Sequence, residues 1–254
     1  MIFVYFIGTA GSGKSHLTKA FQTWCELQHL NALTVNLDPG VTQIPYTPDV
    51  DVREWIDIDE IMTTYKLGPN GAQIACGDLL AVDAPKIKER IMEYRGDYVL
   101  VDTPGQLELF VFRRAGKILV DYLNPAESLI AFLMDPALMT TPSSFVSQLM
   151  LSAITHFRFP IPLVNVLSKK DLLEKESLSQ IQDWGEDPQG LYGEVIQENP
   201  SMSRQLSEGM ITLLTDLAAY TVLTPISSKN LDGLDDLYTI IQNVFSGGED
   251  RIND

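Results

Sequence analysis

Short apolar runs alternate with longer amphipathic stretches along most of the chain. The apolar runs predict six strands, at residues 2–7, 32–37, 97–101, 128–134, 162–167 and 220–224. Between them, apolar residues recur every three to four positions, which is the period of a helix packed on one side. Strands that alternate with helices in this way form a mostly parallel sheet with helices on both faces. We therefore expect an α/β fold with a six-stranded sheet.

The predicted helices follow the same pattern. The first, over residues 15–30, carries Leu17, Phe21, Trp24 and Leu27 on one face. Others are expected at 58–65, at 72–95 with a break or second start at Pro85, and at 106–123, 142–157 and 231–245. Residues 174–220 form a helical elaboration with turn signals at Asp187-Pro188 and Asn199-Pro200. No linker or repeat interrupts this order, so we expect one domain over residues 1–254, with a frayed tail at 246–254.

Two connections contain residues typical of turns and show neither the helix nor the strand period of apolar residues. Residues 41–52 contain Pro45 and Pro48 and are expected to be irregular. Gly68-Pro69-Asn70-Gly71 reads, from its composition alone, as a turn. Arg113 and Arg114 lie in the helix expected at 106–123 and are interpreted as a solvated face, although charge stabilisation in trans is the alternative.

The amino-acid composition limits the classes of binding partner and the cellular location that we expect. The chain of 254 residues has 18 basic and 34 acidic side chains, a net charge of −16. This charge repels nucleic-acid phosphates and anionic lipid headgroups, so we expect neither as a direct partner, whereas a basic protein would fit. No apolar run reaches the length of about 18 residues that spans a membrane. Cys25 and Cys76 are isolated and are interpreted as core residues, which favours a reducing cytoplasm.

The first candidate for chemistry follows the first strand. Residues 8–15 read Gly8-Thr9-Ala10-Gly11-Ser12-Gly13-Lys14-Ser15, the pattern of a phosphate-binding loop. The glycines let several backbone N–H groups converge on one anion, and the next helix points its positive end at the same place. We expect all eight residues to hold phosphate, with Lys14 neutralising β- and γ-phosphate charge and the Ser15 hydroxyl ligating Mg²⁺. A glycine-rich turn that matches by accident is the alternative.

Two other strands end in carboxylates. Asp102, in Asp102-Thr103-Pro104-Gly105-Gln106, is expected to hold Mg²⁺ through water, while the Gly105 N–H meets the γ-phosphate. Asp38 follows the second strand, at the sheet edge where open α/β sheets bind ligands. An aspartate before Pro-Gly also forms turns, so both interpretations of Asp38 stay open. Together with the glycine loop, these segments predict a P-loop NTPase fold.

The ends of the last two strands indicate the base. Asp171, in Ser168-Lys169-Lys170-Asp171, can accept hydrogen bonds from guanine N1–H and the exocyclic amine, a pattern that adenine does not offer. The Lys169 stem can lie across the base plane. Ser227 and Ser228, in the serine loop after the sixth strand, would place a backbone N–H at guanine O6. An exposed helix start is the alternative for Lys-Lys-Asp, but the combination favours GTP.

This combination resembles the GPN-loop GTPases over essentially the whole chain. The most specific marker is Gly68-Pro69-Asn70, between the second strand and the segment 102–106, and the resemblance also covers 36–38 and 45–53. It implies an Mg²⁺-dependent GTPase that forms a homodimer, in which the loop 68–70 reaches the phosphate site of the other subunit and Asn70 contacts the γ-phosphate or the released phosphate. It also implies that Asp38, near the metal, and Gln106 position or activate the attacking water. Ser168 stands where the family has Asn or Thr.

Three functions are compatible with these residues. The first is GTP hydrolysis to GDP and phosphate. The second is a nucleotide-gated binding protein in which slow hydrolysis resets a switch; the resemblance favours a role in assembly of RNA polymerase or similar multisubunit complexes, with a protein partner. The third is a dimeric ATPase or small-molecule kinase, against which Asp171 and the serine loop argue.

Overall fold

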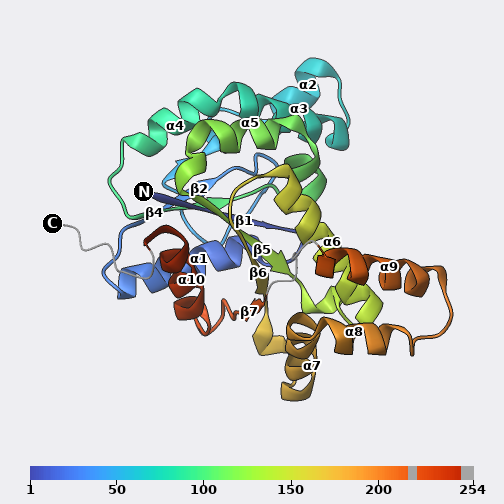
Figure 1. Ribbon diagram of the computed structural model, residues 1–254. Helices are drawn as coiled ribbons and strands as arrows, with labels where there is room; N and C mark the ends of the chain where they lie inside the picture. The colour runs from blue at the N-terminus through green and yellow to red at the C-terminus, as the bar shows by residue number, and fades with distance from the viewer. Residues whose placement is uncertain (217–221, 247–254) are drawn as a thin grey trace.

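The computed structural model describes residues 1–216 and 222–246 and shows a parallel sheet between layers of helices (Figure 1). Its seven strands run in the order β3-β2-β4-β1-β5-β6-β7, and every pairing is parallel. The strands are β1 Ile2–Gly8, β2 Ala32–Asn36, β3 Val50–Asp51, β4 Tyr98–Asp102, β5 Ser128–Met134, β6 Leu163–Leu167 and β7 Leu223–Pro225. The predicted α/β sheet is thereby confirmed, although it has one strand more than the six expected.

The additional strand is β3, and it lies in the connection that was expected to be irregular. Val50 pairs with Val35, and Asp51 pairs with Asn36, at the edge of the sheet. Two residues are too few for a strand period to be visible in the sequence, because β3 is defined by its partner. The last predicted strand, 220–224, is described as Leu223–Pro225, and residues 220 and 221 lie outside the described part.

The helices match the predicted stretches in most places. They are α1 Lys14–Leu27, α2 Ile58–Tyr65, α3 Pro69–Val82, α4 Ala84–Met92, α5 Arg114–Leu123, α6 Pro142–Arg158, α7 Lys175–Glu186, α8 Pro188–Val195, α9 Met202–Asp216 and α10 Leu234–Ser246. Short 3₁₀ turns lie at Val52–Glu54, Pro125–Glu127, Pro136–Leu138 and Lys170–Leu172. None of the helices in this part of the chain has the length and apolar character of a membrane span. The tail expected at 246–254 lies, from residue 247 on, outside the described residues.

Two of these predictions were wrong for local reasons, whereas the break or second start expected at Pro85 was confirmed. Gly68-Pro69-Asn70-Gly71 is the start of α3, not a turn, because Pro69 takes the first helical position, where no N–H is needed. The stretch 72–95 divides at Asp83, just before Pro85. The stretch 106–123 contains a π-helical turn, Glu108–Phe112, before α5 begins. There, a Cβ on Gly116 would lie 2.0 Å from the Phe110 carbonyl oxygen, so only glycine permits this close approach.

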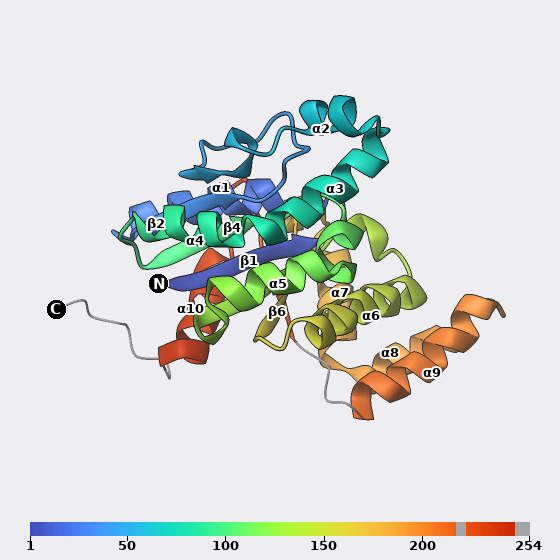
Figure 2. The same ribbon diagram turned by 90° about the horizontal axis from the view of Figure 1, so that it is seen from above.

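The sheet is buried on both faces. Along β1, Phe3, Tyr5 and Ile7 point into the larger core, beneath α3, α4, α5 and α6. Ile2, Val4 and Phe6 point into the opposite core, beneath α1 and α10. Figure 2 shows α1 and α5 on opposite sides of β1. The carboxyl ends of the strands are consequently held at one edge, between the two helical layers.

The elaboration α7–α9 packs on the outer side of α6. The Glu198 carboxylate accepts hydrogen bonds from the Ser143 amide, at 2.8 Å, and the Ser143 hydroxyl, at 2.5 Å, at the start of α6. Phe145 of α6 packs against Trp184 of α7, with ring centroids 5.6 Å apart. These contacts join the elaboration to the helical layer that contains α6, and Figure 1 shows α7, α8 and α9 together at that side of the molecule.

Candidate nucleotide-binding site

The loop 8–15 joins β1 to α1 with a tightly turned backbone. Gly11 and Gly13 have positive φ angles, 78° and 98°, and Gly13 is the residue that precedes α1. Glycine adopts this conformation without strain, whereas a side chain would oppose it. Gly8 is required for a different reason, since a Cβ there would lie 2.6 Å from the Leu133 carbonyl oxygen of β5. The loop therefore turns closely over the sheet edge and presents the amino end of α1 to the space beside it.

Lys14 is the first residue of α1, and its side chain reaches back across the loop to the end of β1. Its ammonium group donates hydrogen bonds to the carbonyl oxygens of Gly8 at 2.9 Å, Thr9 at 3.0 Å and Gly105 at 3.2 Å. The side chain is buried, and desolvation lowers its pKa, while the nearby carboxylates Asp102 and Asp38 oppose that shift. A buried cation satisfied only by neutral carbonyls is well placed to accept an anionic ligand.

Asp102, at the end of β4, lies across the loop from Lys14. Its backbone is in register with Phe6 of β1 and Asn36 of β2. Its Oδ2 accepts a hydrogen bond of 3.0 Å from the Tyr46 hydroxyl. Burial raises the pKa of Asp102 to about 6, despite polar contacts from Ser15 and Tyr46 and the charge of Lys14, which lower it. The polar contacts and Lys14 therefore compensate only part of the desolvation free energy of the ionised carboxylate.

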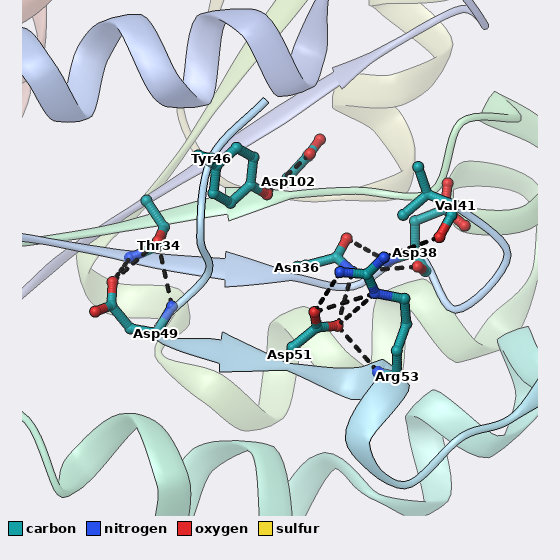
Figure 3. A network of polar contacts seen from close by, with 9 residues as sticks. All are labelled: Thr34, Asn36, Asp38, Val41, Tyr46, Asp49, Asp51, Arg53 and Asp102. Atoms are coloured by element: carbon teal, nitrogen blue, oxygen red, sulfur yellow. Dashed lines mark hydrogen bonds and ion pairs between the residues drawn. The ribbon is translucent and has the colours of Figure 1, made fainter. Parts of the chain in front are cut away.

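Asp38 connects the end of β2 to the end of β4. Its Oδ1 accepts from the Gly40 amide at 2.9 Å, and its Oδ2 accepts from the Gly105 amide at 2.8 Å. Asn36 supports the turn from below, because its Oδ1 accepts from the Asp38 amide at 3.1 Å (Figure 3). The bond from the Gly40 amide closes the turn that the sequence Asp-Pro-Gly predicts. The bond from the Gly105 amide holds Asp38 at the edge of the site. The turn interpretation of Asp38 is thus confirmed, and the residue also lines the cavity described below, while its role toward a ligand stays a prediction.

Two side chains of β3 and its following turn extend this network. The Asn36 amide nitrogen donates to Asp51 Oδ1 at 2.9 Å, and the Arg53 guanidinium forms an ion pair with Asp51 at 2.6 Å. Arg53 also donates to the Val41 carbonyl oxygen at 3.0 Å. The Arg53 side chain holds the pKa of Asp51 below its ordinary value, although burial of the carboxyl opposes this. Figure 3 shows these groups in one continuous network beside the loop that contains Tyr46.

A cavity of about 300 Å³ opens between these groups. Its lining includes Lys14, Ser15, Asp38, Asp102 and Gly105, together with Val41, Gln43 and Pro45 from the connection after β2. The oxygen donors suit a hard cation such as Mg²⁺, and Asp102 Oδ1 is buried with no hydrogen-bond partner within the described residues. Those residues hold no cluster of three or more His, Cys, Asp or Glu side chains that could bind a metal ion unaided. The donor set therefore fits an Mg²⁺ ion that arrives with phosphate oxygens, as in phosphate-loop sites.

A second cavity of about 480 Å³ lies on the other side of the loop. Lys169, Asp171, Leu172 and Ser228 line it, and it shares Gly11, Gly13 and His16 with the first cavity. The two cavities thus meet across the phosphate-binding loop, with room for a base on one side and phosphates on the other.

The base-side residues are fixed by contacts between neighbouring strand ends. Asp171 Oδ1 accepts from the Ser227 hydroxyl at 2.8 Å. Lys169 has a positive φ of 54°, and its ammonium forms an ion pair of 2.7 Å with Asp135, which follows β5. This pair draws the Lys169 stem over the glycine loop, where a Cβ on Gly13 would lie 3.8 Å from the Lys169 Cε. Ser168, for its part, donates to the Met134 carbonyl oxygen at 3.0 Å and so braces the strand end.

Other predicted residues lie outside these cavities. Gln106 is exposed beside Gly105 and does not line either cavity as described. Gly68, Pro69 and Asn70 are exposed at the start of α3 and likewise contribute to neither. Within one copy of the chain, the structure therefore brings the phosphate, metal and base residues together but leaves the loop 68–70 apart.

Several residues of the site were not identified from the sequence. Tyr46 and Asp135 contact Asp102 and Lys169, and His16 and Leu172 line the cavities. Asp135 had one available signal, because it ends a strand in the same way as Asp38 and Asp102. Tyr46 lies within the stretch 45–53 that the family resemblance covers, but no local pattern in this proline-rich connection assigns it a role.

Known proteins with similar sequences agree with this arrangement. A family model described as "Conserved hypothetical ATP binding protein" matches residues 6–247. The GPN-loop GTPase PAB0955 of Pyrococcus abyssi is 33% identical over 239 residues, covering 93% of this chain and 94% of the relative. GPN-loop GTPase 3 of Dictyostelium discoideum is 27% identical, covering 96% of this chain and 87% of the relative. The crystal structure of PAB0955, described as a GTPase in apo form, superposes with a TM-score of 0.87 at 32% identity, covering 96% of this chain and 98% of that one.

Proposed function

Because the chain belongs to the GPN-loop GTPase family, we propose that it binds GTP and hydrolyses it to GDP and phosphate. The observation that carries the proposal is the meeting of two cavities across the loop 8–15. One contains Lys14 and the carboxylates Asp38 and Asp102, and the other contains Lys169 and Asp171. A nucleoside triphosphate has the same division, with a base at one end and a chain of anionic groups at the other.

On the phosphate side, the residues supply charge and position. Lys14 would exchange its bonds to loop carbonyls for β- and γ-phosphate oxygens, while the loop amides and the Gly105 N–H donate to the same groups. Ser15 and Asp102, with Asp38 nearby, would hold Mg²⁺, which when bound neutralises charge between the β- and γ-phosphates. Asp38 and Gln106 would orient the attacking water in line with the bond that breaks, and the water proton would pass to Asp38 or to the phosphate.

On the base side, Asp171 favours guanine over adenine. The exposed Asp171 carboxylate faces the base-side cavity, where it can accept both the N1–H and the exocyclic amine of guanine, whereas adenine offers neither donor pattern. The bond from Ser227 to Asp171 fixes the orientation of that carboxylate. Lys169, held by Asp135, would cover one face of the base, and Ser228 lies at its edge. These contacts support GTP as the substrate in a family whose model is described as ATP binding.

We further propose that the active form is a homodimer in which Asn70 completes the site of the other subunit. Asn70 and the rest of the loop 68–70 are exposed at the start of α3. Five apolar side chains are exposed on α3, the π-helical turn and α5, three elements that pack against one another, and we call this set the apolar patch; Figures 1 and 2 show α3 and α5 side by side. Its members are Ile74, Val82, Phe112, Ile118 and Tyr122, each between 40% and 71% exposed. A patch of this kind supports a contact between copies that would carry the loop with it.

For the cellular output we propose GTP-gated binding of a protein partner, in assembly of multisubunit complexes such as RNA polymerase. The net charge of −16 favours a basic partner surface. The buried, free thiols of Cys25 and Cys76 fit the cytoplasm as location. Pull-down with the protein loaded with a non-hydrolysable GTP analogue or with GDP tests this output, and identical partners in the two states would contradict it.

Phosphate release tests the enzymatic proposal. Purified protein is incubated with GTP or ATP, with Mg²⁺ or with EDTA. We expect phosphate release from GTP only with Mg²⁺, and little from ATP under either condition. Equal turnover of both nucleotides would overturn the assignment of the base, and release of phosphate at the same rate in EDTA would overturn the role of the metal. Lys14→Ala should abolish the reaction, because it removes the cation from the loop.

A further inference from the structure

Tyr46 is a buried aromatic residue in an otherwise irregular connection. It lies between β2 and β3, in the segment that supplies Val41, Gln43 and Pro45 to the wall of the phosphate-side cavity. Its side chain is 7% exposed, and its hydroxyl lies 3.0 Å from Asp102 Oδ2. Figure 3 shows the ring reaching from this segment to the end of β4. A tyrosine buried to this extent usually satisfies its hydroxyl, and here the acceptor is a carboxylate of the candidate metal site.

The carboxylate that Tyr46 contacts has little freedom other than rotation of its side chain. Its backbone is fixed by strand pairing to β1 and β2, and Asp102 is 2% exposed. The bond from Tyr46 engages Oδ2, while Oδ1 is buried and makes no hydrogen bond within the described residues. One oxygen is thus held by the protein, and the other is left for a ligand that arrives later.

The connection itself does not depend on this bond. The Asp49 carboxylate accepts from the Thr34 amide at 2.8 Å and hydroxyl at 2.9 Å, and the Asp49 carbonyl oxygen accepts from the Tyr94 hydroxyl at 3.0 Å. On the other side of Tyr46 in the sequence, the Val41 carbonyl oxygen accepts a hydrogen bond of 3.0 Å from the Arg53 guanidinium. Because these contacts anchor the connection on both sides of Tyr46, the tyrosine hydroxyl is available for orienting Asp102.

We propose that Tyr46 is a positioning residue for the metal: its hydroxyl fixes the Asp102 carboxylate so that Oδ1 is presented to the water shell of Mg²⁺. The proposal rests on the function proposed above. Without the hydroxyl, Oδ2 would be left unpaired in a buried place, and the carboxylate would rotate away from the orientation that presents Oδ1. Partners that orient a metal-binding carboxylate in this way commonly change metal affinity by about 10-fold to 100-fold when they are removed.

The test compares two Tyr→Phe variants, each of which removes a hydroxyl that hydrogen-bonds to a different aspartate. Tyr46→Phe removes the hydroxyl on Asp102, and Tyr94→Phe removes a hydroxyl that holds the same connection at Asp49. Binding and release of a fluorescent GDP are measured over a range of Mg²⁺ concentrations and in EDTA, and thermal unfolding checks that each variant is folded. We expect the Mg²⁺ concentration that gives half of the maximal change in GDP affinity to rise about 10-fold in Tyr46→Phe. Tyr94→Phe should match the unchanged protein, and affinity in EDTA should be the same for all three.

Each other result has a definite meaning. An unchanged Mg²⁺ midpoint in Tyr46→Phe would overturn the proposal while leaving the function intact. Equal loss of affinity in EDTA and in Mg²⁺, or an equal shift in Tyr94→Phe, would also overturn it, because the hydroxyl would then act by holding the connection. If the unchanged protein bound GDP with no response to Mg²⁺, or did not bind it, both the positioning role and the proposed function would be overturned.

Discussion

Asp38 Oδ2 accepts a hydrogen bond of 2.8 Å from the Gly105 amide and so joins the ends of β2 and β4. The Gly105 N–H is also the group expected to meet the γ-phosphate. Both ligands cannot use this donor fully at once, so nucleotide binding would release the Asp38 carboxylate for the attacking water. The same carboxylate keeps its bond to the Gly40 amide, which would hold the turn in place during the exchange.

A first prediction concerns the charge of Asp38. Asp38→Asn keeps one of the two oxygen acceptors, so that either the Gly105 or the Gly40 amide loses its bond, and it removes the negative charge and the proton acceptor. We expect the rate of GTP hydrolysis in a single turnover to fall by about 100-fold or more, while GTP affinity falls less than about threefold. The matched control is Asp121→Asn, which removes an exposed carboxylate paired with Lys117 on α5. Loss of binding and hydrolysis in equal measure would show that Asp38 acts in the ground state alone.

A second prediction concerns the support of Asp171. Ser227→Ala removes the hydroxyl that donates to Asp171 at 2.8 Å. A hydrogen bond to a charged group contributes about 1.5–3 kcal/mol, so GTP affinity should fall by roughly 10-fold or more, with ATP affinity unchanged. Competition titrations measure both. Ser147→Ala, which removes a hydroxyl bonded only within α6, is the control and should leave both affinities as they are. A parallel fall in GTP and ATP affinity would speak against base recognition by Asp171.

A third prediction separates action within one subunit from action between two. Asn70→Ala and Lys14→Ala should each be inactive alone. If Asn70 serves the other subunit, a mixed dimer has one site with an intact Lys14 and an intact Asn70. Random exchange of equal amounts should then restore about a quarter of the original hydrolysis rate. Size-exclusion chromatography of the mixture confirms that dimers form. Dimers that exchange but recover no activity would place Asn70 in the site of its own subunit, and an active Asn70→Ala variant would place it outside the reaction.

A fourth prediction follows from the raised pKa of Asp102. Burial raises the pKa of Asp102 from its ordinary value of 3.8 to about 6 in the folded protein, so the folded state binds more protons than the unfolded state between these pH values. The free energy of unfolding therefore falls as pH rises through this window, and above it the ionised carboxyl costs about 3 kcal/mol. Asp102→Asn removes this cost.

In EDTA at pH 7.5, Asp102→Asn should consequently unfold at a higher temperature than the unchanged protein. The difference should shrink as pH falls below 6 and be smallest below about pH 4. Thermal unfolding followed by circular dichroism measures it, with Asp121→Asn as the exposed counterpart. A variant that is less stable at pH 7.5 would mean that the Asp102 charge is already compensated by Lys14 and the polar contacts.

Much of this molecule could be predicted from local sequence. Apolar runs such as 128–134 coincide with strands because a parallel strand covered on both faces must be apolar throughout. The chemistry-bearing residues Lys14, Asp102 and Asp171 could be placed at one edge because each follows a strand, and parallel strands end on the same side. Those inferences need only the period of the chain and the turn chemistry beside it.

The tertiary structure decided what depends on partners distant in the sequence. β3 is a strand only because Val35 and Asn36 lie beside it, and the π-helical turn exists where Gly116 lets Phe110 approach. The bond from Tyr46 to Asp102 joins residues 56 positions apart, and the bond from Gly105 to Asp38 joins residues 67 apart. The sequence by itself determined the strand–loop–helix order and the groups at each strand end. Which of those groups touch was set by the packing of the strands and the path of the connections, since a hydrogen bond requires a position in space that no local pattern encodes.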